Sequence, residues 1–258
     1  MTLSAQNLTF SHGPKPALFD VSATFERKKF SVILGPNGAG KSTLLACLAG
    51  LQKPDSGKAL LGDLPAFDMP AKARAKAIGV LPQGAETHWA INAEALVALG
   101  RYPHQQGFGL SPADETAIDD AMAATATSNF KGRAVTQLSG GERARVLMAR
   151  VLSGKPQWIL ADEPLANLDP GYQIDTLTLL HAQADQGVGV IAVLHDLHQA
   201  ARYADHIVLL HKGRVFAQGS PAAVLTKETL AAVYGIDADV TTGEEGPVQL
   251  SIKGRVAQ

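Results

Sequence analysis

Residues 35–43 read Gly35-Pro36-Asn37-Gly38-Ala39-Gly40-Lys41-Ser42-Thr43. This stretch fits the pattern G-x-x-x-x-G-K-[ST], with an apolar run before it (30–34) and a helical pattern after it (41–49). Glycine suits such a loop because backbone N–H groups must close around phosphate oxygens, and a Cβ would obstruct that approach. The pattern therefore predicts a phosphate-binding loop (P-loop) between a strand and a helix.

The end of the P-loop indicates a site for a nucleoside triphosphate. A helix that begins at Lys41 presents free N–H groups and the positive end of its dipole to an anion. Lys41 would neutralise the β- and γ-phosphates, and the Ser42 hydroxyl is placed to bind Mg²⁺. We expect the nucleotide to contact Gly35, Asn37, Gly38, Ala39, Gly40, Lys41, Ser42 and Thr43.

Two adjacent acids follow a second apolar run, Trp158 to Ala161. At the carboxyl edge of a sheet, Asp162 can bind Mg²⁺ through water, and Glu163 can orient and polarise an attacking water molecule. Adjacent acids alone are more often a solvated turn, but their place after a buried strand downstream of a P-loop favours the functional interpretation. The pair indicates hydrolysis rather than kinase-type transfer.

A third element, Leu138-Ser139-Gly140-Gly141-Glu142, opens a helical run and is called the signature segment below. Ser139 can cap that helix, while Gly140 and Gly141 leave N–H groups free to meet an anion. The pentapeptide by itself would fit a simple helix cap equally well. Because this pentapeptide occurs in the same chain as the P-loop and the acid pair, we predict that it is a second phosphate-binding element.

Strand and helix patterns alternate along most of the chain. Alternation of this kind predicts an α/β fold with a parallel, doubly wound sheet. Between residues 84 and 152 the pattern is helical instead, apart from a loop at 100–112, and we expect a helical insertion there. The expected strands are 3–10, 21–25, 30–34, 58–61, 78–81, 158–161, 188–194, 207–210 and 215–217, and the expected helices are 41–49, 70–77, 92–99, 113–124, 142–152, 171–184 and 197–203.

The composition narrows the class of protein. The 258 residues include 23 Lys+Arg and 24 Asp+Glu, so the formal net charge of −1 disfavours a nucleic-acid binder that depends on bulk positive charge. The one cysteine, Cys47, lies in an apolar run and excludes an internal disulfide. No apolar run approaches the ~18–20 residues that span a bilayer. We expect a soluble protein of a reducing compartment.

Taken together, the P-loop, the signature segment and the acid pair closely resemble the ATP-binding cassette (ABC) ATPases over essentially the whole chain. The resemblance implies a P-loop NTPase fold, with a RecA-like core and an antiparallel β subdomain (1–83 and 153–258) and an inserted helical subdomain (84–152). The resemblance also implies roles for four further residues, each at a single matching position. These are Gln83 as the Q-loop glutamine that senses Mg²⁺, His195 as the switch histidine near the γ-phosphate, Asp169 in the D-loop at the dimer interface, and His12 at the position where an aromatic residue usually stacks on adenine.

The resemblance also implies partners and a location. ATP and Mg²⁺ would be bound between two copies of the chain in a head-to-tail homodimer, so that the signature segment of one subunit closes over the P-loop of the other. Such a dimer would sit beneath two permease subunits at the cytoplasmic face of a bacterial inner membrane, with a periplasmic or lipoprotein substrate-binding protein as an indirect partner. Nucleic acid is not expected as a partner.

The segment Gly100-Arg101-Tyr102-Pro103 resembles a Gly-Arg-x-Pro stretch in ATPases of iron-siderophore, haem and cobalamin importers. Ferric-siderophore uptake is the expected activity, and haem or cobalamin import is the alternative. A soluble ABC ATPase of translation or DNA repair and a P-loop kinase are competing classes, but the former usually carries two cassettes or a coiled coil. Residues 83–104 are the expected permease contact, with Trp89 and Tyr102 as candidates.

Overall fold

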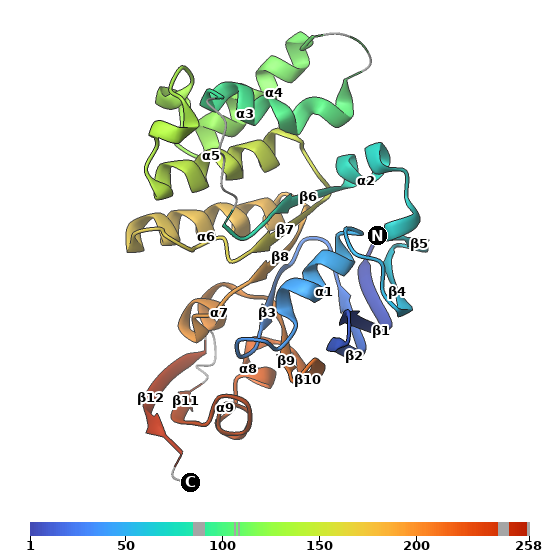
Figure 1. Cartoon of the computed structure of the whole chain (residues 1–258). Coiled ribbons are helices and arrows are strands. Elements are labelled where there is room, and N and C mark those ends of the chain that lie inside the picture. Colours follow the sequence, from blue (N-terminus) through green and yellow to red (C-terminus); the bar gives the residue numbers. More distant parts are fainter. Residues whose placement is uncertain (85–90, 106, 108, 242–247, 257–258) are drawn as a thin grey trace.

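The structure is a computed structural model that describes residues 1–84, 91–105, 107, 109–241 and 248–256. Its elements form three sheets and a group of helices that stands apart at one end (Figure 1). The strands are β1 (Leu3–His12), β2 (Lys15–Phe25), β3 (Phe30–Leu34), β4 (Ser56–Leu61), β5 (Leu64–Pro65), β6 (Ile78–Leu81), β7 (Trp158–Asp162), β8 (Gly189–Val193), β9 (His206–His211), β10 (Arg214–Gly219), β11 (Ile236–Thr241) and β12 (Gln249–Arg255).

The helices occupy most of the connections between these strands. The α-helices are α1 (Lys41–Leu48), α2 (Ala71–Ala77), α3 (Ala93–Ala98), α4 (Pro112–Ala124), α5 (Gly140–Ser153), α6 (Pro170–Asp185), α7 (Leu197–Tyr203), α8 (Pro221–Val224) and α9 (Lys227–Tyr234). Short 3₁₀ turns are η1 (Ala66–Asp68), η2 (Leu99–His104), η3 (Ser128–Phe130) and η4 (Val135–Gln137). Among the described residues, none of the helices combines the length and the apolar character that a membrane span requires.

The largest sheet has the strand order β10-β9-β3-β8-β7-β6. Its five strands from β9 to β6 are parallel, which confirms the α/β alternation predicted from the sequence. The parallel arrangement does not extend to β10, which pairs antiparallel with β9. The two residues between them, Lys212 and Gly213, both have positive φ, and a two-residue turn of this kind returns the chain as a hairpin.

Strand β3 explains why both faces of this sheet are covered. Phe30, Val32 and Leu34 point into the core formed with the later helices, and Ile33 points into the core around α1. Side chains alternate between the faces of a strand, so an almost wholly apolar strand requires apolar partners on both sides. Helix α1 packs between the large sheet and the β1–β4 sheet, and this position holds its N-terminus, with the P-loop, at the carboxyl edge of β3.

The N-terminal sheet is antiparallel, with the order β2-β1-β4-β5. Strand β2 begins at Lys15 rather than at the predicted Val21, because Lys15 pairs with His12 at the tip of the β1–β2 hairpin. Cys47 is buried in α1, as predicted from its apolar neighbours.

Between β6 and β7 the described elements are helical. Serine and asparagine side chains cap α3, α4 and α5, with Asn92, Ser111 and Ser139 each accepting a hydrogen bond from a backbone N–H in the first turn. The loop predicted for residues 100–112 is partly wrong, because its first residues form η2. These helices form the upper part of the molecule in Figure 1.

The C-terminal elements α8, α9, β11 and β12 were not predicted. Strand β12 is mostly exposed, forms a two-stranded sheet with β11, and packs against α7. Its sequence has little apolar alternation because a two-stranded ribbon buries little surface. Only the pairing with β11 in three dimensions identifies it as a strand.

Candidate functional site

The P-loop adopts a conformation that its glycines make possible. Gly35, Gly38 and Gly40 have φ values of +147°, +78° and +97°. A Cβ at Gly35 would meet the Leu210 carbonyl oxygen, and one at Gly40 would lie 2.7 Å from the Ala17 carbonyl oxygen. Glycine is therefore required at both positions by backbone conformation and by the close approach of neighbouring strands.

Lys41 lies at the start of α1 with its ammonium folded back into the loop. Its Nζ donates to the carbonyl oxygens of Gly35 at 2.8 Å and Pro36 at 3.0 Å, and the residue is only 6% exposed. Burial lowers the pKa of the Lys41 ammonium, and the carboxylates of Glu163 and Asp162 act in the opposite direction. A buried cation is thus held inside a glycine loop, with two acids close enough to influence its pKa.

Ser42 and Asp162 meet across the same edge of the sheet. The Ser42 hydroxyl donates to Asp162 Oδ1 at 3.0 Å. Burial raises the pKa of Asp162, the neighbouring Glu163 carboxylate raises it further, and the Ser42 hydrogen bond opposes the shift. Positive charge near this carboxylate would relieve the cost of its burial.

Three polar side chains come from the carboxyl ends of three adjacent strands. Gln83 follows β6, Glu163 follows β7 and His195 follows β8. Gln83 Nε2 donates to Glu163 Oε2 at 2.7 Å, and His195 Nε2 lies 2.6 Å from Glu163 Oε1. Glu163 itself has a φ of +51°, a backbone conformation that non-glycine residues seldom adopt and that recurs at functional positions. Parallel strands therefore bring together three residues that are far apart in sequence.

These residues line a cavity of about 680 Å³, called the P-loop cavity below. Its size suits a nucleotide, since ligand sites commonly measure ~300–1,000 Å³. Its walls are His12, Lys15, Pro16, Ala17, Asn37, Gly38, Gly40, Lys41, Ser42, Thr43, Gln83, Glu163 and His195. Of the P-loop residues predicted to contact nucleotide, Gly35 and Ala39 are not in these walls, because both are buried beneath the loop surface.

Three residues of the P-loop cavity were not predicted from the sequence, namely Lys15, Pro16 and Ala17. They begin β2 and reach the cavity because the β1–β2 hairpin folds over the P-loop. Gly13 and Pro14 form the turn between β1 and β2, but nothing in the sequence indicated which face of that hairpin would meet the loop.

The signature segment lies outside the P-loop cavity. Ser139 and Glu142 form a reciprocal capping box at the start of α5, so the predicted cap is confirmed. Gly140 lines a separate hollow of about 200 Å³ that also reaches Asp162 and Glu163. Asp169 occupies the N-cap position of α6 without a capping side-chain bond in the described structure. The signature N–H groups are therefore not directed into this chain's own P-loop cavity.

His12 lies at the rim of the P-loop cavity, where an adenine-stacking residue was predicted. Its ring packs edge-on against Phe10 at a centroid separation of 4.9 Å, and its Nε2 lies 3.3 Å from Thr43 Oγ1. We expect His12→Tyr to tighten ATP binding about two- to tenfold, because a larger ring gives a stacking partner worth ~0.5–1.5 kcal/mol. Titration of MgATP by calorimetry measures the change. His181→Tyr on α6 is the control, and an unchanged dissociation constant for His12→Tyr would remove the residue from the adenine site.

Comparison with known proteins agrees with this geometry. A family model described as "ABC transporter" matches residues 18–166. The hemin import ATP-binding protein HmuV of Bordetella avium is 41% identical over 249 residues, which cover 93% of this chain and 94% of that protein.

Two solved structures share the fold. One, described as a metal-chelate type ABC transporter in an inward-facing conformation, is 27% identical with a TM-score of 0.82 and covers 97% of both chains. The other, described as a dimeric ATP-binding cassette in a post-hydrolysis state with ADP and Pi, is 28% identical with a TM-score of 0.77 and covers 86% of this chain and 99% of that chain. This chain therefore belongs to the ABC transporter family and is an ATP-hydrolysing subunit with the ABC ATPase fold.

Proposed function

We propose that this chain hydrolyses ATP to power a haem importer. The observation that carries the proposal is the 41% identity, over nearly the full length of both chains, to a protein named for hemin import. The likeness to a metal-chelate type transporter supports the same class of cargo. Of the cargoes predicted from the sequence, these similarities favour the haem alternative over the expected ferric siderophore.

ATP would enter the P-loop cavity with its phosphates over the start of α1. Residues of the P-loop and the first residues of α1 line that space, and Lys41 Nζ can exchange the Gly35 and Pro36 carbonyls for phosphate oxygens. This exchange replaces two neutral acceptors by a charged one and so favours the triphosphate.

The residues beside the γ-phosphate position fit Mg²⁺. The Ser42 hydroxyl and the Asp162 carboxylate are hard oxygen donors 3.0 Å apart, and Mg²⁺ prefers one or two such ligands together with phosphate and water. Ser42 and Asp162 would hold the ion, with Gln83 close enough to sense it through the Glu163 contact. When bound, Mg²⁺ supplies positive charge to the phosphate oxygens.

Glu163 is the proposed general base. Each of its carboxylate oxygens has one polar partner, Gln83 on one side and His195 on the other, and keeps a second lone pair for a water molecule. The γ-phosphate would attract His195 and so leave the carboxylate more open to the attacking water. Gln83 and His195 thus act as groups that position the base and respond to nucleotide.

A homodimer would complete each site. The signature segment has N–H groups at the start of α5 that are not directed into the P-loop cavity of the same chain, which leaves them available to the nucleotide of a second copy. Asp169, exposed at the start of α6, would lie in the same interface. One dimer would then contain two composite sites related by twofold symmetry.

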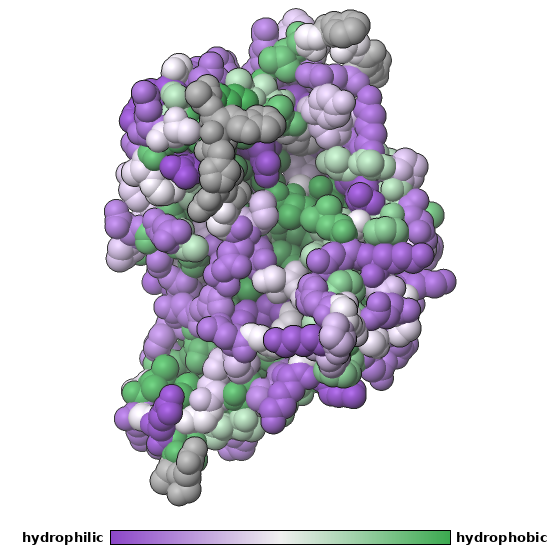
Figure 2. All heavy atoms as spheres, in the orientation of Figure 1, coloured by the Kyte–Doolittle hydropathy of each residue, from purple (hydrophilic) through white to green (hydrophobic). Residues whose placement is uncertain are grey.

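The permease is proposed to dock on the segment from Gln83 to His104. An apolar hollow of about 160 Å³ lies there between α2, β6, η2 and the end of α5, and Figure 2 shows apolar surface over β6 beside α2. Tyr102, which directly precedes Pro103 of the hollow in sequence, is 73% exposed, and Trp89 lies outside the described residues. Two permease subunits, served by a substrate-binding protein, would place the chain at the cytoplasmic face of the inner membrane.

The cargo is tested by transport. The transporter, isolated through an affinity tag on this chain and reconstituted in liposomes, should accumulate haem when ATP is supplied on the side of this chain. Ferric siderophore and cobalamin are the competing cargoes, and the Glu163→Gln transporter is the control for ATP dependence. Uptake of ferric siderophore without uptake of haem would reject the haem assignment.

A further inference from the structure

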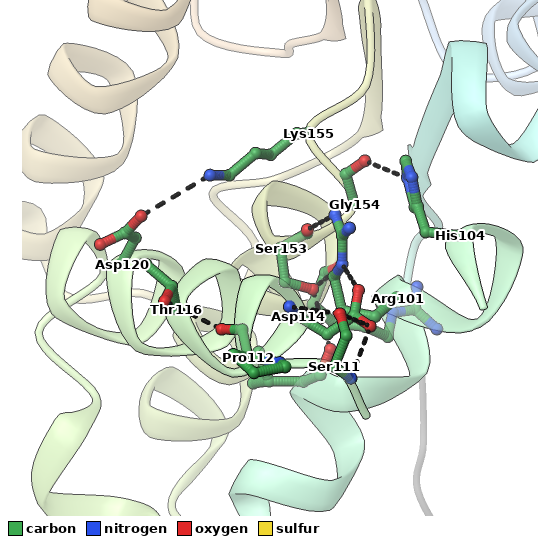
Figure 3. A network of polar contacts seen from close by, with 12 residues as sticks. Arg101, His104, Ser111, Pro112, Asp114, Thr116, Asp120, Ser153, Gly154 and Lys155 are labelled. Carbon is green, nitrogen blue, oxygen red and sulfur yellow. Dashed lines mark hydrogen bonds and ion pairs between the residues drawn. The ribbon is translucent and has the colours of Figure 1, made fainter. Parts of the chain in front are cut away.

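The short segment η2 is fastened to the helical group by a buried arginine, as Figure 3 shows. Arg101 is 8% exposed; its Nε donates to Asp114 Oδ1 at 2.7 Å, and its Nη1 donates to the Ser153 carbonyl oxygen at 2.8 Å. Asp114 belongs to the first turn of α4, and Ser153 is the last residue of α5. One guanidinium therefore joins three elements, and the three residues together are called the Arg101 clamp below.

The anion of the clamp is itself held in place. The second carboxylate oxygen of Asp114 accepts from the Ser111 N–H at 3.0 Å and from the Ser111 hydroxyl at 2.7 Å. These hydrogen bonds and the Arg101 guanidinium keep the pKa of Asp114 well below its usual range. The carboxylate is consequently ionised and fixed at the N-terminus of α4, where a negative charge is favoured.

Further hydrogen bonds and close packing join η2 to the end of α5. His104 Nε2 lies 2.9 Å from the Gly154 carbonyl oxygen, and a Cβ at Gly100 would meet the Arg150 carbonyl oxygen. The Ser153 hydroxyl donates to the Val97 carbonyl oxygen at 2.8 Å, just before η2. Close packing and charge-assisted hydrogen bonds together resist relative movement of the two segments.

The outer side of η2 is open to solvent. Leu99 is 52% exposed and Tyr102 is 73% exposed, although both are large apolar or aromatic side chains. Helix α5 runs for 14 residues, about 20 Å, from the signature glycines to Ser153 at the clamp. Its middle is buried, so it can transmit a displacement as a rigid rod.

We propose that Arg101 is a positioning residue that makes η2 and α5 move as one body, so that permease contact on η2 displaces the signature segment at the far end of α5. The inference rests on the proposed function only in that a permease contacts η2. Arginine is required because one planar fork must reach both the carboxylate and the carbonyl. Lysine carries the same charge but cannot hold the two acceptors in that geometry.

The test compares ATPase activity of the free chain with that of the assembled transporter, isolated through a tag on this chain. Arg101→Lys and Arg101→Gln should leave kcat and KM of the free chain within about twofold of the wild type. The ratio of assembled to free activity should fall about fivefold or more. Lys155→Gln is the matched control. Lys155 lies in the loop after α5, and its Nζ is 3.7 Å from a carboxylate oxygen of Asp120 on α4, in an exposed ion pair outside the Arg101 clamp.

Each outcome separates a positioning role from a structural one. If Arg101→Lys keeps the wild-type ratio, or if the free chain loses activity in parallel with the transporter, the proposal is overturned. Should the single variants fold poorly because Asp114 is left buried without its partner, the paired change Arg101→Met with Asp114→Leu removes both charges. That variant should fold, and its ratio of assembled to free ATPase activity should fall as in the single variants. A wild-type ratio in the double variant would also overturn the proposal.

The ratio of assembled to free ATPase activity is measured without cargo. An error in the haem assignment would therefore leave this ratio unchanged and would be detected only in the uptake assay. If the wild-type transporter showed no stimulation over the free chain, the proposed permease contact would fail, and the role proposed for Arg101 would fail with it. The two proposals are therefore tested separately.

Discussion

Glu163→Gln is expected to lower ATP turnover about 10²- to 10⁴-fold, the range that a positioned general base contributes. The amide of glutamine has the shape of the carboxylate and can still bond to Gln83 and His195, which lie 2.7 and 2.6 Å from the present oxygens. It cannot accept a proton from water at neutral pH. Steady-state hydrolysis of MgATP measures the loss, and binding of MgATP should remain within about threefold of the wild type.

The same variant should accumulate an ATP-bound dimer, because nucleotide would close the two copies and hydrolysis would no longer release them. Size-exclusion chromatography with MgATP detects the dimer. Glu115→Gln, at an exposed position on α4, is the control for loss of one carboxylate elsewhere. Normal steady-state hydrolysis by Glu163→Gln would remove this residue from the base role.

Lys41→Ala is expected to weaken ATP binding about 10²-fold, since truncating one partner of a buried charge pair costs ~2–5 kcal/mol. The variant removes the one side chain that donates to both Gly35 and Pro36 carbonyls beneath the phosphate position. The protein itself should lose little stability, because a buried ammonium whose pKa is lowered by burial is costly to keep. Calorimetric titration of MgATP and thermal unfolding measure the two effects separately.

Lys15→Ala is the matched control for Lys41→Ala. Lys15 lines the same P-loop cavity, but it is exposed at the start of β2, so its charge is screened by water. If the two alanine variants weakened ATP binding equally, the effect would reflect general charge in the cavity rather than the position of Lys41.

Much of the fold could be predicted from local patterns. The run from Phe30 to Leu34 is apolar at every position but Ser31, which predicts a strand covered on both faces, and the glycines after it predict a loop with positive φ. Caps such as Ser139 depend on residues within one helical turn. These features depend on a few neighbouring residues, and a single sequence therefore shows them.

The parts that were missed depend on distant partners. The antiparallel direction of β10 depends on the turn at Lys212-Gly213 and on β9, and β12 becomes a strand only by pairing with β11. The cavity wall at Lys15 to Ala17 depends on how the N-terminal hairpin folds over the P-loop. Arg101 was noted only as part of a family-like stretch, and nothing in the sequence indicated that Asp114 and the Ser153 carbonyl oxygen would bury its charge.

The sequence by itself determined the chemistry of the individual groups: a glycine loop for phosphate, a lysine at a helix start, and acids after an apolar strand. The sequence did not determine how these groups are arranged in space. Gln83, Glu163 and His195 form one hydrogen-bonded set only because parallel strands β6, β7 and β8 place their carboxyl ends side by side. Local conformation follows from residues a few positions apart, whereas contacts across 80 or 32 residues exist only once the sheet has formed.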